Sequence, residues 1–178
     1  MAVVDIPGAY LSADMDDEVH VVFRGTLAEL MVAADPELYR PLMSYETGQA
    51  FLYVRLQKEI YGCLKSALLL YEKLMEDLGT YGFRINPYDP CVANNIVGGN
   101  QLTVCWHVDD LKISCVEANK VTKMIQWLES EYGEMHRSRG KRYYYRGMWT
   151  DYSIPGKVRI YMEEYLRVVL DGLPEEIT

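Results

Sequence analysis

The sequence is poor in positive charge and in long apolar stretches, and each shortage excludes a class of protein. Lysine and arginine number 18 against 26 aspartate and glutamate residues, which gives a net charge of −8. This charge balance argues against a nucleic-acid-binding surface, because phosphates are normally neutralised by clustered basic side chains. No apolar run reaches the roughly 18 residues that a membrane-spanning helix needs. The N-terminus also lacks a basic segment followed by a long apolar one, so we expect no secretory signal and no membrane partner.

Cysteine is scarce as well, with four residues that show no paired spacing. We therefore expect free or buried thiols in a reducing compartment, and neither disulfides nor a zinc site. Hydrophobic residues make up 49% of the chain and charged residues 25%, which is typical of a folded protein. A length of 178 residues predicts one core, with room for a smaller lobe.

Two adjacent aspartates, Asp109 and Asp110, stand between two strand-like apolar segments. These segments, residues 102–106 and 111–115, predict a β-hairpin with both acids at its tip. Neighbouring carboxylates repel each other, so a pair at one tip is costly unless a cation neutralises it. The alternative is a solvated turn, because aspartate is an ordinary turn residue.

A third carboxylate, Asp5, ends a short β-branched segment near the N-terminus. Pro7 and Gly8 then turn the chain, and the aromatic Tyr10 follows. Asp5 by itself is compatible with an ordinary strand end. Together with the distant hairpin it gives the three carboxylates that two-metal phosphoryl transfer requires, with two Mg²⁺ ions about 3.5–4 Å apart.

Several short blocks follow one another along the chain. They are residues 5–11 (DIPGAYL), 56–63 (LQKEIYGC), 86–94 (NPYDPCVAN), 106–110 (WHVDD), 145–148 (YRGM) and 160–166 (IYMEEYL). In this order they resemble the motifs of the reverse transcriptase of copia-type long-terminal-repeat retrotransposons. Each block is weak alone, but several in the family's order are specific, and the resemblance covers nearly the whole chain.

Three departures from that family are visible. His107 replaces the usual aromatic residue before Val-Asp-Asp, and Arg146 replaces an apolar residue in the block near the primer. After Gly62 the usual basic and tryptophan positions are filled by residues 66–70. The resemblance implies that residues 1–178 form a truncated reverse transcriptase palm with partial fingers, without the thumb or the RNase H domain.

The resemblance also implies a role for individual residues. Asp5 and Asp109 would bridge two Mg²⁺ or Mn²⁺ ions, and Asp110 would complete this catalytic and metal site. Tyr10 would be a steric gate against a ribose 2′-hydroxyl, although a core aromatic is the alternative. The implied nucleotide-binding residues are Ile6, Pro7, Gly8, Ala9, Tyr10, Gly62 and Lys112, the last with an ordinary surface lysine as its alternative.

The function implied is RNA-directed DNA polymerisation, with deoxynucleoside triphosphates and an RNA or DNA template–primer as partners. The flanking thumb, RNase H and integrase domains of the polyprotein would be further partners, in a cytoplasmic retrotransposon particle or in the nucleus. Because those domains and a positive surface are lacking, we expect the chain alone to extend primers poorly. The rivals are an inactive transposon relic and another palm-fold nucleotidyl enzyme such as a cyclase.

Periodicity and turn residues predict the secondary structure. The fold class expected is α+β, a polymerase palm with helices on one face of an antiparallel sheet. Ser66 is a candidate helix cap. The basic run 136–142 is expected to be a solvated loop, with a basic cluster that contacts nucleic acid as the alternative. Strands are predicted at residues 19–23, 50–56, 91–97, 101–106, 143–149 and 158–162, and helices at 27–34, 66–81, 116–132 and 163–170.

Overall fold

The computed structural model describes residues 1–63 and 65–173, which form two compact units. The larger unit comprises Met1–Ala9 and Leu70–Thr178, and the smaller unit comprises Tyr10–Leu69. Both units contain helices and antiparallel sheets, so the predicted α+β class is confirmed. Within the described ranges, no helix is long and apolar enough to cross a membrane.

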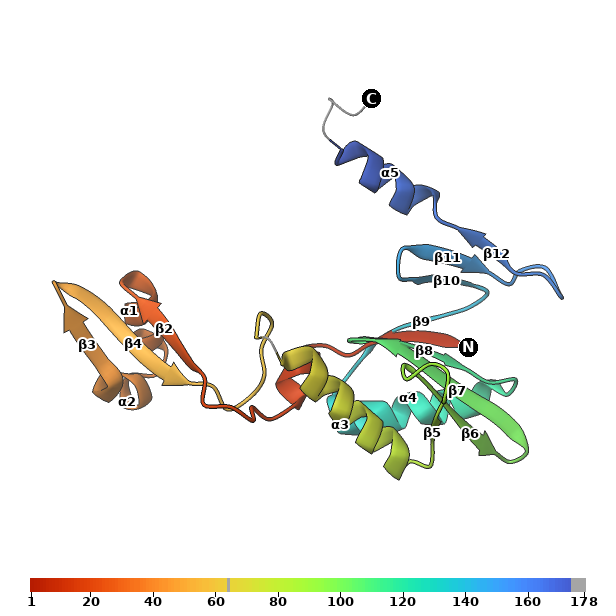
Figure 1. Cartoon of the computed structure of the whole chain (residues 1–178), viewed down its shortest axis with the longest axis horizontal. Coiled ribbons are helices and arrows are strands. Elements are labelled where there is room, and N and C mark those ends of the chain that lie inside the picture. Colours follow the sequence, from red (N-terminus) through yellow and green to blue (C-terminus); the bar gives the residue numbers. More distant parts are fainter. Residues whose placement is uncertain (64, 174–178) are drawn as a thin grey trace. The chain divides into compact units, whose positions relative to one another are not determined.

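Most of the helices and strands are labelled in Figure 1, and their numbers follow the order of the chain. The strands are β1 (Ala2–Asp5), β2 (His20–Arg24), β3 (Met43–Glu46), β4 (Gln49–Arg55), β5 (Arg84–Ile85), β6 (Val92–Val97), β7 (Asn100–His107), β8 (Asp110–Ser114), β9 (His136–Arg139), β10 (Arg142–Tyr145), β11 (Met148–Asp151) and β12 (Arg159–Tyr161). The helices are η1 (Ala9–Ser12), α1 (Thr26–Ala34), α2 (Pro36–Tyr39), η2 (Arg40–Leu42), α3 (Ser66–Thr80), α4 (Ala118–Tyr132) and α5 (Glu163–Asp171).

The larger unit is built on a six-stranded antiparallel sheet with the order β5-β6-β7-β8-β1-β9. Strands β7 and β8 form the predicted hairpin. The N-terminal strand β1 lies between β8 and β9, so segments more than a hundred residues apart in the sequence are neighbours in the sheet. This order brings the end of β1 to the tip of the hairpin.

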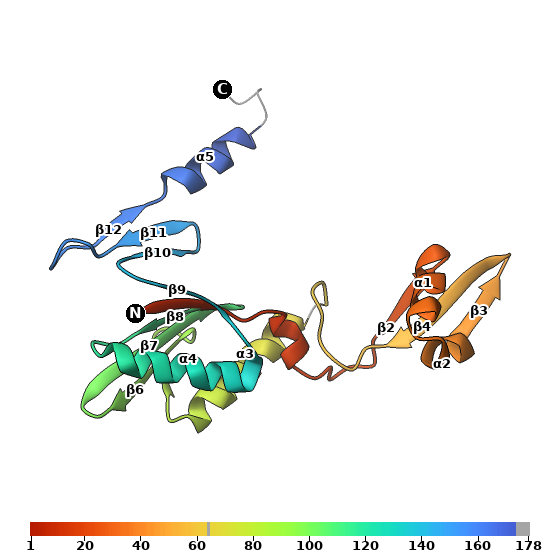
Figure 2. The ribbon, with the colours of Figure 1, turned by 180° about the vertical axis from the view of Figure 1, so that it is seen from behind.

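The two faces of this sheet differ in chemistry. Along β8, Leu111 and Ile113 are fully buried, whereas Asp110 and Lys112 point to the other face, as the period of two requires. Helices α3 and α4 cover the apolar face, and the sheet of β10, β11 and β12 lies on the polar side (Figures 1 and 2). The helix residues buried in this core are Leu70, Leu74, Leu78, Val121, Met124, Ile125 and Leu128.

Helices α3 and α4 are also joined to each other. The Tyr81 ring, just after α3, packs 4.5 Å from the Trp127 ring of α4. The Tyr132 hydroxyl of α4 donates to Asp77 of α3, which also accepts from Lys73 at 2.9 Å. Burying a leucine side chain contributes about 1.5–3 kcal/mol, so the apolar stripes of α3 and α4 dominate the stability of this layer.

The segment 143–149 was predicted as one strand, and this is wrong. It forms β10 and β11, joined by a two-residue turn in which Arg146 and Gly147 have φ of 52° and 76°. Two positive φ angles are typical of the type I′ turn that closes tight hairpins. A Cβ on Gly147 would approach Tyr165 of α5 to 2.9 Å, so this glycine also permits a close contact with the helix.

The basic segment 136–142 was expected to be a solvated loop, which is also wrong in part. Its first half is the edge strand β9, paired with β1 along its whole length. Arg137 lies 3.6 Å from Glu129, and Arg139 donates to Thr122 at 2.7 Å. These two arginines therefore support α4 and do not form a separate basic patch.

The smaller unit contains the sheet β2-β4-β3 with helices α1 and α2. Its core is centred on Ala28, Ala50 and Leu52, with partly buried apolar side chains around them. Strands β2 and β4 match the predicted segments to within one residue, whereas α2 and β3 were not predicted. The predicted cap, Ser66, is the first residue of α3, and its hydroxyl lies 2.7 Å from the carbonyl oxygen of Ile60.

Candidate active site

The aspartate pair lies at a strained turn. Strand β7 ends at His107, β8 begins at Asp110, and Val108 and Asp109 connect them. Val108 has a φ of 56°, an unusual conformation for a β-branched residue. Strain of this kind costs about 1–3 kcal/mol and is concentrated at functional sites in proteins. The turn therefore fixes the direction of both acids at the expense of stability.

Asp5 lies beside this turn, as the sequence predicted. In the antiparallel register of β1 and β8, Asp5 is directly opposite Asp110. The Ile6 amide also donates to the Asp109 carbonyl oxygen at 3.0 Å, which ties the end of β1 to the turn. The expected proximity of the three acids is thus confirmed in the backbone, while their catalytic role stays a prediction.

The electrostatics of Asp110 follow from this packing. Burial raises the pKa of its carboxyl above the ordinary value, and the negative charges of Asp109 and Asp5 raise it further. Electrostatic interactions with His107 and Arg146 act on the pKa of Asp110 in the opposite direction. A carboxylate that is desolvated and surrounded by like charges is the arrangement that a bound cation would stabilise.

We expect Val108→Gly to stabilise the protein by about 1 kcal/mol, because glycine adopts a positive φ without strain and part of the gain is lost to chain entropy. The free energy of unfolding, measured by urea denaturation, checks this. A matched control is Val116→Gly, which removes an exposed valine where no positive φ is recorded. A loss of stability in Val108→Gly would contradict the strain argument.

The residues of the predicted triphosphate-binding segment differ in their exposure and in whether their backbone amide can bind a phosphate. Ile6 is buried and its amide is already bonded to Asp109, while Pro7 has no amide hydrogen to donate. Gly8 is exposed with a φ of 60°, and the side chain of Ala9 is fully buried. Of the first three residues, Gly8 is therefore the one that is exposed and also has an amide hydrogen.

The remaining predicted nucleotide-binding residues lie in two places. Tyr10 and Gly62 belong to the smaller unit, where the rings of Tyr10 and Tyr61 meet edge to face at 4.4 Å. Gly62 is exposed and has a φ of 98°. Lys112 is two residues beyond Asp110 on β8, and its Nζ lies 6.0 Å from the ring centroid of Tyr145.

A mixed polar cluster continues from Lys112 across the polar side of the sheet. Cys105 of β7 is directly opposite Lys112, and its thiol and the Tyr145 hydroxyl interact. Burial raises the pKa of both groups, so each stays protonated at neutral pH. Tyr145 thus covers Lys112 and supports this side of the site.

The three acids carry the carboxylate oxygens that Mg²⁺ and Mn²⁺ prefer as ligands. Across residues 1–63 and 65–173, no three His, Cys, Asp or Glu side chains are already gathered as a metal cluster. The fit rests instead on the donor set: Asp5 and Asp110 are cross-strand partners, and Asp109 adjoins them. Burial first, and then the charges of Asp109 and Asp5, raise the pKa of Asp110, and a bound cation would offset both effects.

The sequence did not predict that two further residues, His136 and Arg146, would lie near the acids. His136 of β9 is directly opposite Asp5, a pairing across 131 positions that no local pattern indicates. Arg146 is close enough to Asp110 to lower its pKa, an effect that depends on the unpredicted turn between β10 and β11. The register of β1 was the missing information in the first case.

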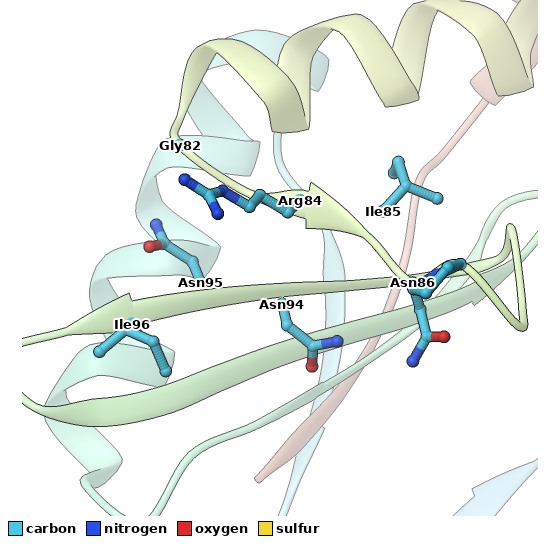
Figure 3. A pocket seen from close by; sticks show the side chains of 8 residues that line it. Gly82, Arg84, Ile85, Asn86, Asn94, Asn95 and Ile96 are labelled. Atoms are coloured by element: carbon cyan, nitrogen blue, oxygen red, sulfur yellow. The ribbon is translucent and has the colours of Figure 1, made fainter.

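A pocket of about 630 Å³ lies elsewhere in the larger unit, along β5 and β6 (Figure 3). Figure 3 shows the guanidinium of Arg84 on the same side as Asn95, near Gly82. The Asn95 amide donates to the carbonyl oxygen of Tyr81, the residue after the end of α3, at 3.5 Å. None of the three predicted catalytic acids lines this pocket.

Comparison with models of known protein families gave no match, and no curated protein matched the chain.

Proposed function

We propose that the chain is the palm, with part of the fingers, of an RNA-directed DNA polymerase of the copia-type retrotransposon kind. The observation that carries the proposal is the pairing of Asp5 with Asp110 across β1 and β8, beside Asp109 in the strained turn. The motif order of the sequence supports it independently. The chemistry proposed is attack of a primer 3′-hydroxyl on the α-phosphate of a deoxynucleoside triphosphate, with pyrophosphate leaving.

In this proposal the chain's own groups position the reaction. Asp5, Asp109 and Asp110 would hold the divalent cations, which when bound would neutralise charge on the attacking and leaving oxygens. The β7–β8 turn, fixed by the Ile6–Asp109 hydrogen bond, keeps the carboxylates at one place relative to the primer end. The amide of the exposed residue Gly8 donates to a triphosphate oxygen, and Lys112 offsets part of the negative charge.

Nucleotide binding tests the proposal in the 178-residue chain itself. We expect Mn²⁺-dependent binding of a fluorescent deoxynucleoside triphosphate and slow, complementary addition of one nucleotide to an RNA-templated primer at low salt. Asp5→Asn and Asp110→Asn should lower the addition rate by about 10³-fold, since each removes a cation ligand. Glu76→Gln, an exposed acid on α3, is the matched control and should leave both signals unchanged.

Two outcomes separate the alternatives. Mn²⁺-dependent nucleotide binding without any addition, even after family-like fingers and thumb segments are joined to the chain, would favour an inactive relic that retains the palm. Cation-independent nucleotide binding that is the same in Asp110→Asn would contradict the proposal. Formation of a cyclic nucleotide from the triphosphate, without a primer, would favour the cyclase-like alternative.

Discrimination between sugars is expected to depend on Tyr10, which the motif resemblance assigns as the gate against a ribose 2′-hydroxyl. We expect Tyr10→Ala to reduce the preference for deoxy- over ribonucleoside triphosphates by about 10- to 200-fold, the range by which a pocket rejects a small extra group. The ratio of the two dissociation constants measures this. Tyr45→Ala, an exposed tyrosine of β3, is the control. An unchanged ratio in Tyr10→Ala would make Tyr10 a packing residue against Tyr61.

A further inference from the structure

Four side chains form one row across neighbouring strands of the large sheet. His107 of β7 is opposite Asp110 of β8, Asp110 is opposite Asp5 of β1, and Asp5 is opposite His136 of β9. Directly opposed residues of antiparallel strands point to the same face, with Cβ atoms about 4.5–5.5 Å apart. The row is therefore His–Asp–Asp–His on the side of the sheet that α3 and α4 leave uncovered.

The histidines of this protein are concentrated beside the paired aspartates. The protein has three histidines, and two of them flank the paired aspartates. The third, His20, belongs to the smaller unit, where its Nε2 lies 3.9 Å from Glu18. On β9, alternation directs Arg137 and Arg139 towards α4 and leaves His136 on the side of Asp5.

The chemistry of the row differs from that of an all-carboxylate site. Mg²⁺ prefers oxygen ligands alone, whereas Mn²⁺ and later divalent ions of the first transition series also accept imidazole nitrogen. Side chains on adjacent strands can meet at one ion. His107 and His136 are three strand spacings apart, about 14 Å, so they cannot share one ion. Each histidine is therefore suited to a different ion, together with its neighbouring aspartate.

We propose that His107 and His136 are imidazole ligands that extend the Asp5–Asp110 pair into two mixed histidine–aspartate half-sites, selective for transition-series divalent cations over Mg²⁺. This rests on the proposed function, because it concerns the same two acids. The half-sites assemble when the ion draws the side chains together, since none of the described His, Cys, Asp and Glu side chains already forms a group of three. Replacing His107 and His136 therefore changes which ion is bound, while the aspartates decide whether any ion is bound.

Electron paramagnetic resonance of Mn²⁺ bound to the full chain tests this directly, because coupling to an imidazole ¹⁴N nucleus identifies the ligand without any activity measurement. Mn²⁺ also avoids the four free thiols, which prefer softer ions. We expect the ¹⁴N coupling in the wild type, its loss in His107→Phe/His136→Gln, and its retention in His20→Asn. The ratio of Mg²⁺ to Mn²⁺ dissociation constants should fall by about tenfold or more in the double variant.

The two histidines are exposed, so the variants should fold. Each single variant provides a second measurement, in which we expect part of the loss of ¹⁴N coupling and part of the fall in the ratio of dissociation constants. Mn²⁺ binding that is lost in Asp110→Asn but never shows ¹⁴N coupling would overturn this inference and leave the proposed function standing. Mn²⁺ binding that is indifferent to both Asp110→Asn and the histidine variants would overturn both. A ¹⁴N signal that survives in the double variant and disappears in His20→Asn would place the ion in the smaller unit and overturn the inference.

Discussion

Asp110→Asn is expected to raise the stability of the metal-free protein at neutral pH and to abolish its stabilisation by Mn²⁺. Asp110 is directly opposite Asp5, and burial together with the charges of Asp109 and Asp5 raises the pKa of its carboxyl. The amide has nearly the same shape but no charge, so the variant loses a repulsion and, with it, a cation ligand. A substitution that removes function and adds stability is the behaviour expected at a site that stores electrostatic strain.

The size of the Mn²⁺ effect follows from mass action. At a free concentration one hundred times the Kd, a ligand that binds only the folded state stabilises it by about 2.7 kcal/mol. For a chain of this length that corresponds to a rise in Tm of about 5–10 °C. Calorimetric melts with and without MnCl₂ measure it, with Glu76→Gln as the charge-matched control. An Asp110→Asn protein that melts lower without metal, or responds to Mn²⁺ like the wild type, would contradict the argument.

The pH dependence of stability provides an independent check on the same residue. Because the pKa of Asp110 is higher in the folded protein than in the unfolded chain, the folded state binds more protons between the two values. Protonation of Asp110 therefore favours folding, and its contribution to stability increases as the pH falls from 7 through the raised pKa towards the ordinary one. The difference in Tm between wild type and Asp110→Asn should shrink from pH 7 to pH 4. A difference that grows on acidification would show that the pKa of Asp110 is lowered.

Elements with local signals were predictable from the sequence. The hairpin β7–β8, helix α3 and helix α4 each combine a clear period with turn residues at the ends, and the structure contains all of them within a few residues. Strand β9 carries no such pattern, because its four residues are all exposed. It is a strand because β1 supplies a hydrogen-bonding edge, a contact between distant segments that propensity does not encode.

The candidate site likewise contains some residues that local motifs predict and others that depend on contacts between distant segments. Two carboxylate motifs were enough to predict that Asp5 and Asp110 would be neighbours, because a shared cation requires it. His136 was not predicted, since its place opposite Asp5 depends on the register of an edge strand. The turn at Arg146 and Gly147 was missed because Arg-Gly is a weaker hairpin signal than Asn-Gly or Asp-Gly.

Glu59→Met is expected to stabilise the smaller unit by about 1–3 kcal/mol, because the wild-type carboxylate is buried with an incomplete set of partners. Glu59 is fully buried, and Ser66 hydrogen-bonds its Oε2, whereas no described residue donates to its Oε1. The Ser66 hydroxyl has one proton and also lies 2.7 Å from the Ile60 carbonyl oxygen, so the two acceptors compete for it. Methionine fills a similar volume and leaves the Ser66–Ile60 hydrogen bond in place.

A double-mutant cycle separates this explanation from a simple packing gain. Ser66→Ala alone should cost about 1–3 kcal/mol, because it removes the one described donor to a buried carboxylate. In the Glu59→Met background the same change should cost less than about 1 kcal/mol, since only the bond to Ile60 is lost. Urea denaturation measures all four proteins, and Glu72→Met, an exposed glutamate of α3, should stay within about 0.5 kcal/mol of wild type. Equal costs for Ser66→Ala in both backgrounds, or a loss of stability in Glu59→Met, would contradict this explanation and show that the Glu59 side chain contributes to stability.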